Sequence, residues 1–174
     1  MYIHDIAQKL GFEDDYDAVF YLIKKSNGDA GGCFFMMCEE DTELVMSHPR
    51  AMICTDSGVA MGKDTYHPRL RASFPRTLGR YVRERKVTSL PEMIRKMTAL
   101  PAEVYGLKGK GKIAEGYDAD LCIFDPETIL DQAEFTNCKL PNLGLNYVLV
   151  DGKVVVKDGV YNGIRAAKLC RREQ

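Results

Sequence analysis

Two short apolar runs on either side of an acidic stretch limit the fold more than any other feature of the sequence. The runs are residues 33–37 (CFFMM) and 51–55 (AMICT), and each is too short for a helix. Between them, residues 39–47 begin with acidic side chains, which the dipole of a helix favours in its first turn. Strand, helix and strand over this length predict a βαβ unit with parallel strands. Nearly continuous apolar strands indicate burial on both faces, so the expected class is α/β.

Further helices are predicted on both sides of this unit. Residues 18–23 follow two aspartates and predict a strongly buried helix that ends near Lys25. Downstream, a glycine-containing loop is expected from Gly58 to about Arg71, followed by two amphipathic helices and a short turn of helix closed by Gly106. The second of the amphipathic helices begins with a capping box, Ser89 to Glu92.

The last third of the chain has a different sequence pattern, in which glycines separate short predicted strands. Residues 119–124 predict a strand, and residues 146–150 and 153–156 predict a hairpin. Asp151-Gly152 between them supplies the positive φ angles of a type I′ turn. We therefore predict two domains, residues 1–107 and 108–174.

Composition and charge exclude several classes of protein. Hydrophobic residues make up 45% of the chain and charged residues 28%, as in globular proteins. A formal net charge of −1 predicts neither a nucleic-acid partner nor a membrane-surface partner. No apolar run reaches the roughly 20 residues of a membrane-spanning helix. Asp5, Gln8 and Lys9 interrupt the start of the chain, so no secretory signal is expected there.

The six cysteines are expected to be free thiols. No two of them have the C-x2-C spacing of a zinc knuckle or a redox motif, and several lie in apolar runs. Together with the missing signal, this predicts a reducing, cytoplasmic location.

Asp56 is the first candidate for a catalytic residue. It follows the predicted strand at 51–55 and precedes Ser57-Gly58. In α/β barrels catalytic groups gather at the carboxyl ends of strands, where Asp56 could serve as a metal ligand or a general base. The alternative is that its side chain caps the Ser57-Gly58 turn.

The loop beyond Asp56 adds His67-Pro68-Arg69, and Arg76 follows. The rigid His-Pro step holds an imidazole and a guanidinium near one spot, and arginine can bind a carboxylate through two parallel hydrogen bonds. The alternative is an exposed loop with a surface cation. His4 and His48 are weaker candidates, and the sequence has neither H-x-H nor H-E-x-x-H, so no metal site is predicted from the residues alone.

Several motifs resemble the N-acyl-D-amino-acid deacylases (D-aminoacylases) of the amidohydrolase superfamily. The most specific are residues 53–58 (ICTDSG), His67-Pro68-Arg69 and residues 74–84 (FPRTLGRYVRE); residues 94–102 resemble the next helix of that family. Residues 111–121 (GKIAEGYDADL) and 148–155 (VLVDGKVV) resemble the return into the small β-domain of the superfamily and its closing hairpin. The resemblance covers most of the chain.

The resemblance implies a fold, an activity and site residues. The fold would be the last βα units of a TIM-like metal-dependent hydrolase barrel, plus strands of a small β-sandwich domain. The activity would be hydrolysis of N-acyl-D-amino acids to a carboxylate and a free D-amino acid, with Zn2+ as cofactor. Asp56 matches the catalytic aspartate, which moves a proton from metal-bound water to the leaving nitrogen. Arg69 matches the arginine that binds the α-carboxylate of the substrate, and His67 matches the histidine beside it.

The same resemblance implies that the metal ligands belong to earlier strands, which this sequence does not contain. We therefore expect the isolated chain to be inactive and to bind no zinc stably. Two parallel strands cannot close a barrel, and the strand at 33–37 would leave an open edge. This predicts self-association, or a partner that supplies the missing N-terminal portion. Two other functions remain open, a non-catalytic assembly module and a fragment of a hydantoinase-like or dihydroorotase-like cyclic amidase.

Overall fold

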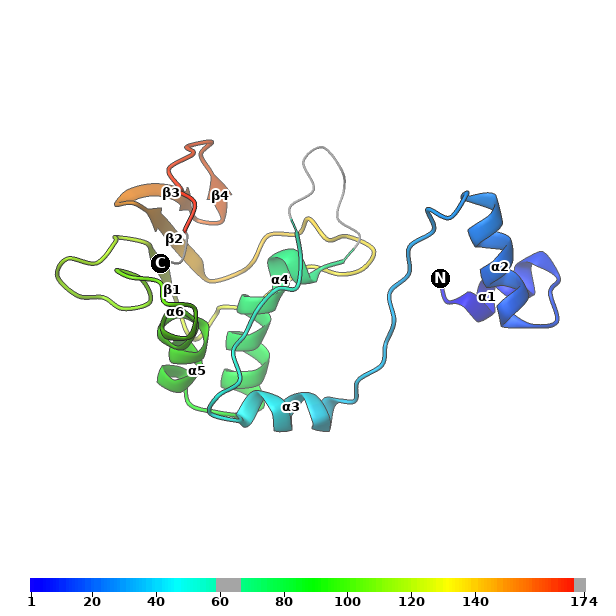
Figure 1. The fold of residues 1–174 in the computed structure, drawn as a ribbon, viewed down its shortest axis with the longest axis horizontal. Helices are drawn as coiled ribbons and strands as arrows, with labels where there is room; N and C mark the ends of the chain where they lie inside the picture. The colour runs from blue at the N-terminus through cyan, green and yellow to red at the C-terminus, as the bar shows by residue number, and fades with distance from the viewer. Residues whose placement is uncertain (59–66, 171–174) are drawn as a thin grey trace. The chain divides into compact units, whose positions relative to one another are not determined.

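The chain divides into two compact units, Met1–Met36 and Met37–Gln174, which are described separately below. The structure is a computed structural model that describes residues 1–58 and 67–170, and Figure 1 shows the course of the chain. Most of the predicted loop after Gly58 therefore lies outside the described residues. No helix among the described residues is long and apolar enough to cross a membrane.

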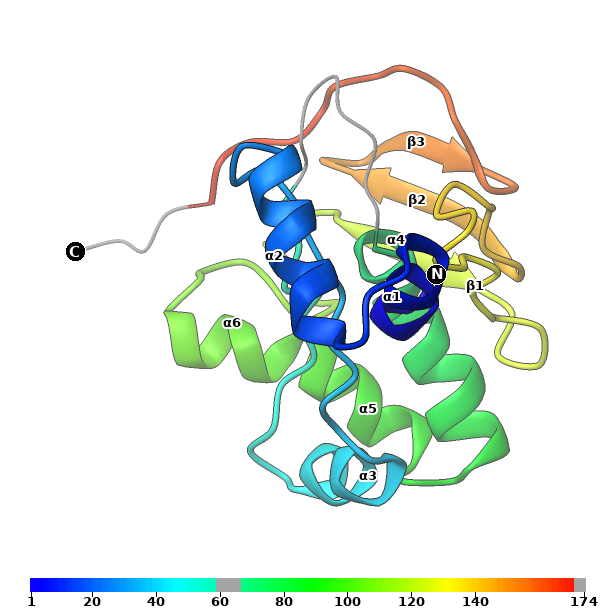
Figure 2. The ribbon, with the colours of Figure 1, turned by 90° about the vertical axis from the view of Figure 1, so that its right-hand side faces the viewer.

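The first unit is a pair of helices, α1 (Ile3–Leu10) and α2 (Asp15–Lys25), which lie side by side in Figure 2. Asp14 begins α2 by accepting a hydrogen bond from the Tyr16 amide at 2.7 Å. The predicted helix at 18–23 is confirmed, but its predicted burial is wrong. Phe20 and Ile23 are 67% and 45% exposed. Two paired helices of this length share one face, so apolar side chains elsewhere on α2 stay uncovered.

The helices of the second unit begin and end close to the predicted positions. They are α3 (Glu39–Ser47), α4 (Arg69–Arg76), the π-helix η1 (Thr77–Glu84), α5 (Leu90–Met97) and α6 (Ala99–Tyr105). The Ser89 hydroxyl accepts a hydrogen bond from the Glu92 amide at 3.4 Å, so Ser89 caps α5 as predicted. The Glu92 carboxylate accepts from Arg95 at 2.8 Å, so the second half of the predicted capping box does not form. Gly106 ends α6 in the left-handed conformation.

The strands of the second unit form one antiparallel sheet in the order β1-β2-β3-β4. They are β1 (Leu121–Phe124), β2 (Leu145–Val150), β3 (Lys153–Lys157) and β4 (Val160–Tyr161). Asp151 and Gly152 join β2 to β3 with φ angles of 51° and 72°, as a type I′ turn requires. The predicted hairpin is confirmed.

The predicted βαβ unit is not formed. Residues 33–37 and 51–55 lie in no strand of the described chain, although α3 forms between them as predicted. A strand requires at least one hydrogen-bonded partner, and residues 33–37 are open to solvent instead, with Phe34 81% exposed and Met36 85% exposed. Residues 51–55 run alongside α5 instead, where the Ile53 amide donates a hydrogen bond of 3.4 Å to the Lys96 carbonyl.

A hydrophobic core connects the helices of the second unit to the sheet. Leu78 of η1, Met93 of α5 and Ile129 form its centre, and Phe124 and Leu145 from the sheet pack against it. This core includes residues on both sides of position 107. The predicted domain boundary at 107/108 stays a prediction.

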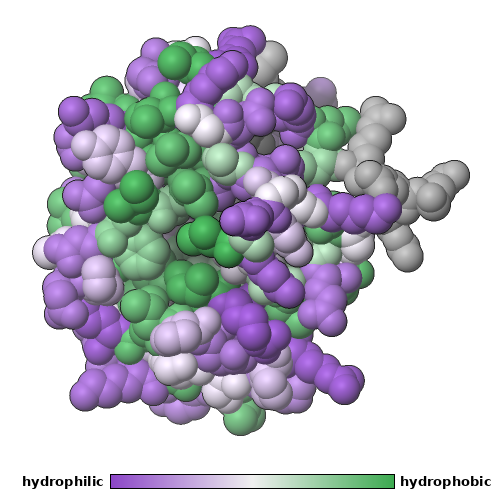
Figure 3. Space-filling model, turned by 90° about the vertical axis from the view of Figure 1, so that its left-hand side faces the viewer, coloured by the Kyte–Doolittle hydropathy of each residue, from purple (hydrophilic) through white to green (hydrophobic). Residues whose placement is uncertain are grey.

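Apolar side chains of the sheet that stay partly exposed also meet across its strands. Register places Leu121 and Ile123 of β1 beside Leu149 and Tyr147 of β2, and Leu149 beside Val154 of β3. We call these five residues the outer sheet face. Ile123 is 50% exposed, and Figure 3 shows apolar side chains gathered on the side of the molecule that carries the sheet.

Candidate active site

Asp56 lies at the end of the extended segment that leaves α3 and runs past α5. Its φ angle is 46°, in the left-handed region where aspartate is tolerated better than most residues. Its side chain is 82% exposed. The backbone turn at Asp56 therefore points an acidic group outward from the segment.

Arg69 is the first residue of α4, and its guanidinium meets Asp56. The Nη1 atom of Arg69 lies 2.9 Å from Oδ2 of Asp56, with the arginine side chain 43% exposed. The Ser73 hydroxyl donates a hydrogen bond of 2.7 Å to the Arg69 carbonyl and closes the first turn of the helix. The structure thus brings together two candidates that are 13 positions apart in the sequence.

His67 lies beside this ion pair, two residues before Arg69. Its Nδ1 atom accepts a hydrogen bond of 3.1 Å from the Arg69 amide, which leaves the ring proton of neutral His67 on Nε2. Burial lowers the pKa of His67 below its ordinary value, and the positive charges of Arg69 and Arg76 lower it further, while Asp56 opposes them. His67 is therefore held neutral at physiological pH.

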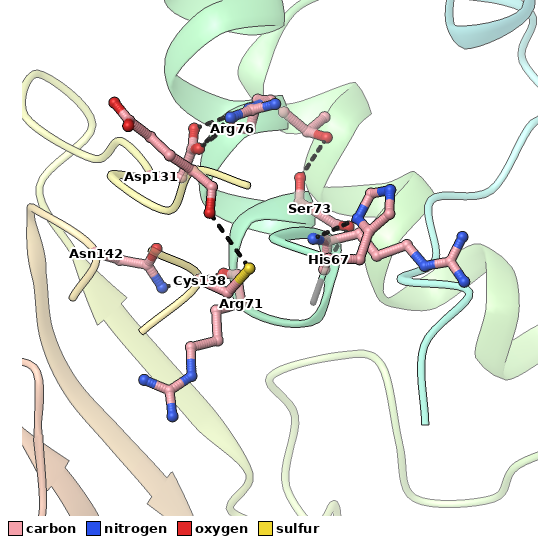
Figure 4. Close-up of polar contacts among 10 residues, drawn as sticks. His67, Arg71, Ser73, Arg76, Asp131, Cys138 and Asn142 are labelled. Carbon is pink, nitrogen blue, oxygen red and sulfur yellow. Dashed lines mark hydrogen bonds and ion pairs between the residues drawn. The ribbon is translucent and has the colours of Figure 1, made fainter. Parts of the chain in front are cut away.

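Arg76 is directed elsewhere. Its guanidinium binds both carboxylate oxygens of Asp131, with Nη2 at 2.6 Å from Oδ2. Figure 4 shows this contact, and also shows the side chain of Arg71 pointing away from His67 at the start of α4. Neither Arg71 nor Arg76 therefore adds a second guanidinium to Arg69 for binding a carboxylate.

The described residues do not by themselves fit a zinc site. Within residues 1–58 and 67–170, no three His, Cys, Asp or Glu side chains gather closely enough to hold a metal ion. A catalytic zinc takes three protein ligands, whereas Asp56 offers one carboxylate that is already paired. His4 and His48 are used locally: His4 bonds Asp15 at 3.1 Å, and His48 accepts from the Arg50 amide at 3.2 Å.

Three residues near the site were not predicted from the sequence. Asp131 pairs with Arg76, Phe135 touches the His67 ring with the ring centroids 5.0 Å apart, and Lys96 is fully buried, with its carbonyl bonded to the Ile53 amide of the segment that leads to Asp56. The burial of Lys96 could have been predicted from the sequence, since Lys96 follows Met93 by three positions and so lies at the edge of the apolar face of α5. Asp131 and Phe135 lie in an irregular segment with no periodicity.

Comparison with known proteins gives relatives among the deacylases, and a dihydroorotase of Lactobacillus johnsonii also matches, at 33% identity over 93 residues, 46% of this chain and 21% of that enzyme. The chain is 40% identical over 127 residues to an N-acyl-D-glutamate deacylase of Alcaligenes xylosoxydans xylosoxydans, covering 72% of this chain and 25% of that enzyme. A crystal structure of D-aminoacylase matches with a TM-score of 0.85 and 34% identity, over 98% of this chain and 34% of that one. N-acyl-D-glutamate deacylase from Bordetella bronchiseptica, solved with zinc and a phosphonate inhibitor, matches with a TM-score of 0.78 and 36% identity, over 95% and 34%.

These matches confirm the resemblance to the deacylases and show that the mixed α/β structure corresponds to part of the D-aminoacylase fold. The chain spans about a quarter to a third of the length of these relatives. The model of the amidohydrolase family matches residues 41–156, which include Asp56, His67 and Arg69. The chain belongs to the amidohydrolase family.

Proposed function

We propose that this chain contributes a general base and a carboxylate-binding arginine to the hydrolysis of an N-acyl-D-amino acid. The observation that carries the proposal is the contact of 2.9 Å between Asp56 and Arg69. The contact brings a carboxylate and a guanidinium to one site, as the proposed hydrolysis requires. Both residues belong to the part of the sequence that most resembles the deacylases. The 40% identity to an N-acyl-D-glutamate deacylase supports the same assignment.

In this proposal the two side chains act on opposite ends of the substrate. Arg69 binds the α-carboxylate, for which its planar guanidinium offers parallel hydrogen bonds. Asp56 accepts a proton from the water that attacks the acyl carbon, and delivers it to the amide nitrogen as the C–N bond breaks. Because the substrate carboxylate competes with Asp56 for Arg69, binding of the substrate frees the base to act.

The chain alone is not expected to turn over substrate. Its relatives are about three times as long, and the described residues supply no set of metal ligands. The deacylase of Bordetella bronchiseptica was solved with zinc, and a single carboxylate cannot hold such an ion against water. The proposed hydrolysis of N-acyl-D-amino acids is therefore inferred from the similarity to the deacylases.

Carboxylate binding by the pure chain tests the proposal without requiring turnover. We expect N-acetyl-D-glutamate to perturb the Arg69 amide in an NMR titration, with weak affinity. Arg69→Lys should weaken binding by about tenfold, because a bidentate contact of roughly 1.5 kcal/mol is lost. Asp56→Asn should tighten binding, because it removes the internal competitor.

Arg80→Lys is the matched control, since Arg80 lies on η1, which follows α4, with its guanidinium 3.3 Å from the Glu39 carboxylate. Its affinity for N-acetyl-D-glutamate should equal that of the wild type. Equal weakening by Arg80→Lys and Arg69→Lys would contradict the assignment. Hydrolysis of the compound by the pure chain with added Zn2+, abolished by Asp56→Asn, would overturn the expected inactivity.

A second candidate function is a non-catalytic assembly module, and exposed apolar surface favours it. Residues 34–37 are four consecutive large apolar side chains, each at least 68% exposed. The outer sheet face adds a second apolar surface, with Ile123 half exposed. Surfaces of this kind favour association with another copy of the chain or with another polypeptide.

Sedimentation tests this second candidate. We expect the purified chain to form dimers or larger species at micromolar concentration. Replacing Phe34, Phe35 and Met36 with serine should shift the population toward monomer. As a control, Ile113→Ser changes a residue that is 91% exposed outside both apolar surfaces and should leave the distribution unchanged. A wild-type chain that sediments as a monomer throughout contradicts the candidate.

A further inference from the structure

The segment from Asp131 to Asn142 is tied to the α4–η1 helix at both of its ends. At one end, the Asp131 carboxylate binds the Arg76 guanidinium, with only 5% of the aspartate side chain exposed. At the other end, the Asn142 side-chain amide donates to the Arg71 carbonyl at 3.1 Å, and the Arg71 guanidinium donates to the Lys139 carbonyl at 3.2 Å. The segment therefore has a fixed position relative to the helix that begins with Arg69.

Between these ties the segment forms a closed turn. The amides of Glu134 and Asn137 each donate to the carbonyl of the other at 3.1 Å. The Cys138 thiol donates to the Glu134 carbonyl at 3.3 Å, and Cys138 is buried. Such a turn has little freedom to move, and Phe135 is the large apolar side chain that it carries.

Phe135 is aimed at His67. The two rings meet edge to face, with centroids 5.0 Å apart and planes at 71°. Nδ1 of the same His67 ring accepts a hydrogen bond from the Arg69 amide. A continuous set of contacts thus runs from the anchored turn through Phe135 and His67 to the backbone of Arg69, beside the ion pair with Asp56.

We propose that Phe135 is a positioning residue, which holds the His67 ring so that His67 in turn fixes the start of α4 and the carboxylate-binding Arg69. This rests on the proposed function for the role of Arg69, but the contact itself is independent of it. Rotation of the imidazole by 180° would replace the Nδ1 acceptor with a carbon atom and free the Arg69 amide. The edge-to-face contact with an anchored phenyl ring opposes that rotation.

The side-chain nitrogen resonances of His67 test the proposal in the uniformly 15N-labelled chain. Comparison with His67→Gln assigns this ring among the three histidines. In the wild type above pH 7 we expect one tautomer, with the proton on Nε2 and a bare Nδ1. In Phe135→Ala the two nitrogen shifts should move toward each other, toward the mixture seen for a free imidazole, and the Arg69 amide should exchange with solvent several-fold faster.

Two variants separate positioning from general loss of packing. Phe135→Tyr keeps the ring and should restore the single tautomer. Leu143→Ala removes an apolar side chain directly after the segment that, like Phe135, is 45% exposed, and it should leave His67 unchanged. The proposal is overturned if Phe135→Ala keeps the wild-type His67 signals, or if Leu143→Ala alters them as much.

Titration of the same samples with N-acetyl-D-glutamate keeps this proposal distinct from the proposed function. If Phe135 positions Arg69, affinity should fall several-fold in Phe135→Ala and recover in Phe135→Tyr. Unchanged affinity in Phe135→Ala refutes the step from His67 to Arg69. If the wild type binds no carboxylate at all, the proposed function fails, and the tautomer result still decides whether Phe135 holds His67.

Discussion

Replacing Lys96 with alanine is expected to lower the free energy of unfolding by roughly 3 kcal/mol, a large share of the stability of a small domain. Lys96 is 0% exposed, and its Nζ atom donates to the Met46 carbonyl at 2.6 Å, near the end of α3. Alanine would leave a cavity in place of the buried chain and an unpaired carbonyl at Met46. Denaturation in urea followed by circular dichroism gives the value.

Lys96→Met is the matched variant. It keeps most of the volume and removes a charge whose burial is unfavourable, since burial lowers the pKa of Lys96 below its ordinary value. One hydrogen bond is lost in exchange, so the variant should lie within about 1 kcal/mol of the wild type. If Lys96→Met is as damaging as Lys96→Ala, the ammonium contact with Met46 matters more than packing. If both unfold like the wild type, the buried position of Lys96 is wrong.

The second large effect is expected at the ion pair between Arg76 and Asp131. Arg76→Ala should destabilise the chain by roughly 2 to 3 kcal/mol, because it leaves a carboxylate without its partner in a site where 5% of that side chain is exposed. The arginine itself is 44% exposed, so the full penalty of a deeply buried pair is not expected. The same urea experiment measures it.

Two further variants define the cause. Arg80→Ala removes an arginine of the next helical turn whose pair with Glu39 is 48% and 33% exposed, and should cost less than about 1 kcal/mol. The double variant Arg76→Met with Asp131→Leu should recover most of the loss, because no charge is then left unpaired. Equal losses in Arg76→Ala and Arg80→Ala, or no recovery in the double variant, would show that the buried carboxylate is not the source.

Local signals in the sequence predicted local structure well. Acidic residues at the start of α3, the Ser89 cap of α5 and the Asp-Gly turn between β2 and β3 each act within a few residues, so each is readable from its own neighbourhood. The parallel strands at 33–37 and 51–55 were wrong because strand formation requires partners far away in the chain. Apolar composition predicts that a segment tends to be buried, and does not identify what covers it.

The residues of the candidate site were predictable from local sequence, whereas the contacts between them were not. Asp56, His67 and Arg69 were found through a family resemblance and their local pattern, and their roles stay predictions. Their contact depends on how the Asp56 segment passes the start of α4, which no short motif encodes. Phe135 and Asp131 reach the site from more than 50 positions downstream in an irregular segment, where the sequence has no periodicity to interpret.

The left-handed backbone at Asp56 has a consequence for how this position tolerates change over evolutionary time. At a φ angle of 46°, glycine fits best, and asparagine fits at least as well as aspartate. The substitutions that relieve backbone strain at position 56 are therefore the same ones that remove the carboxylate. A lineage under selection for stability alone would drift toward Gly or Asn, whereas retention of aspartate would report that selection still acts on chemistry. The identity of residue 56 among close homologues thus tests whether selection has kept the proposed catalytic site or only the fold.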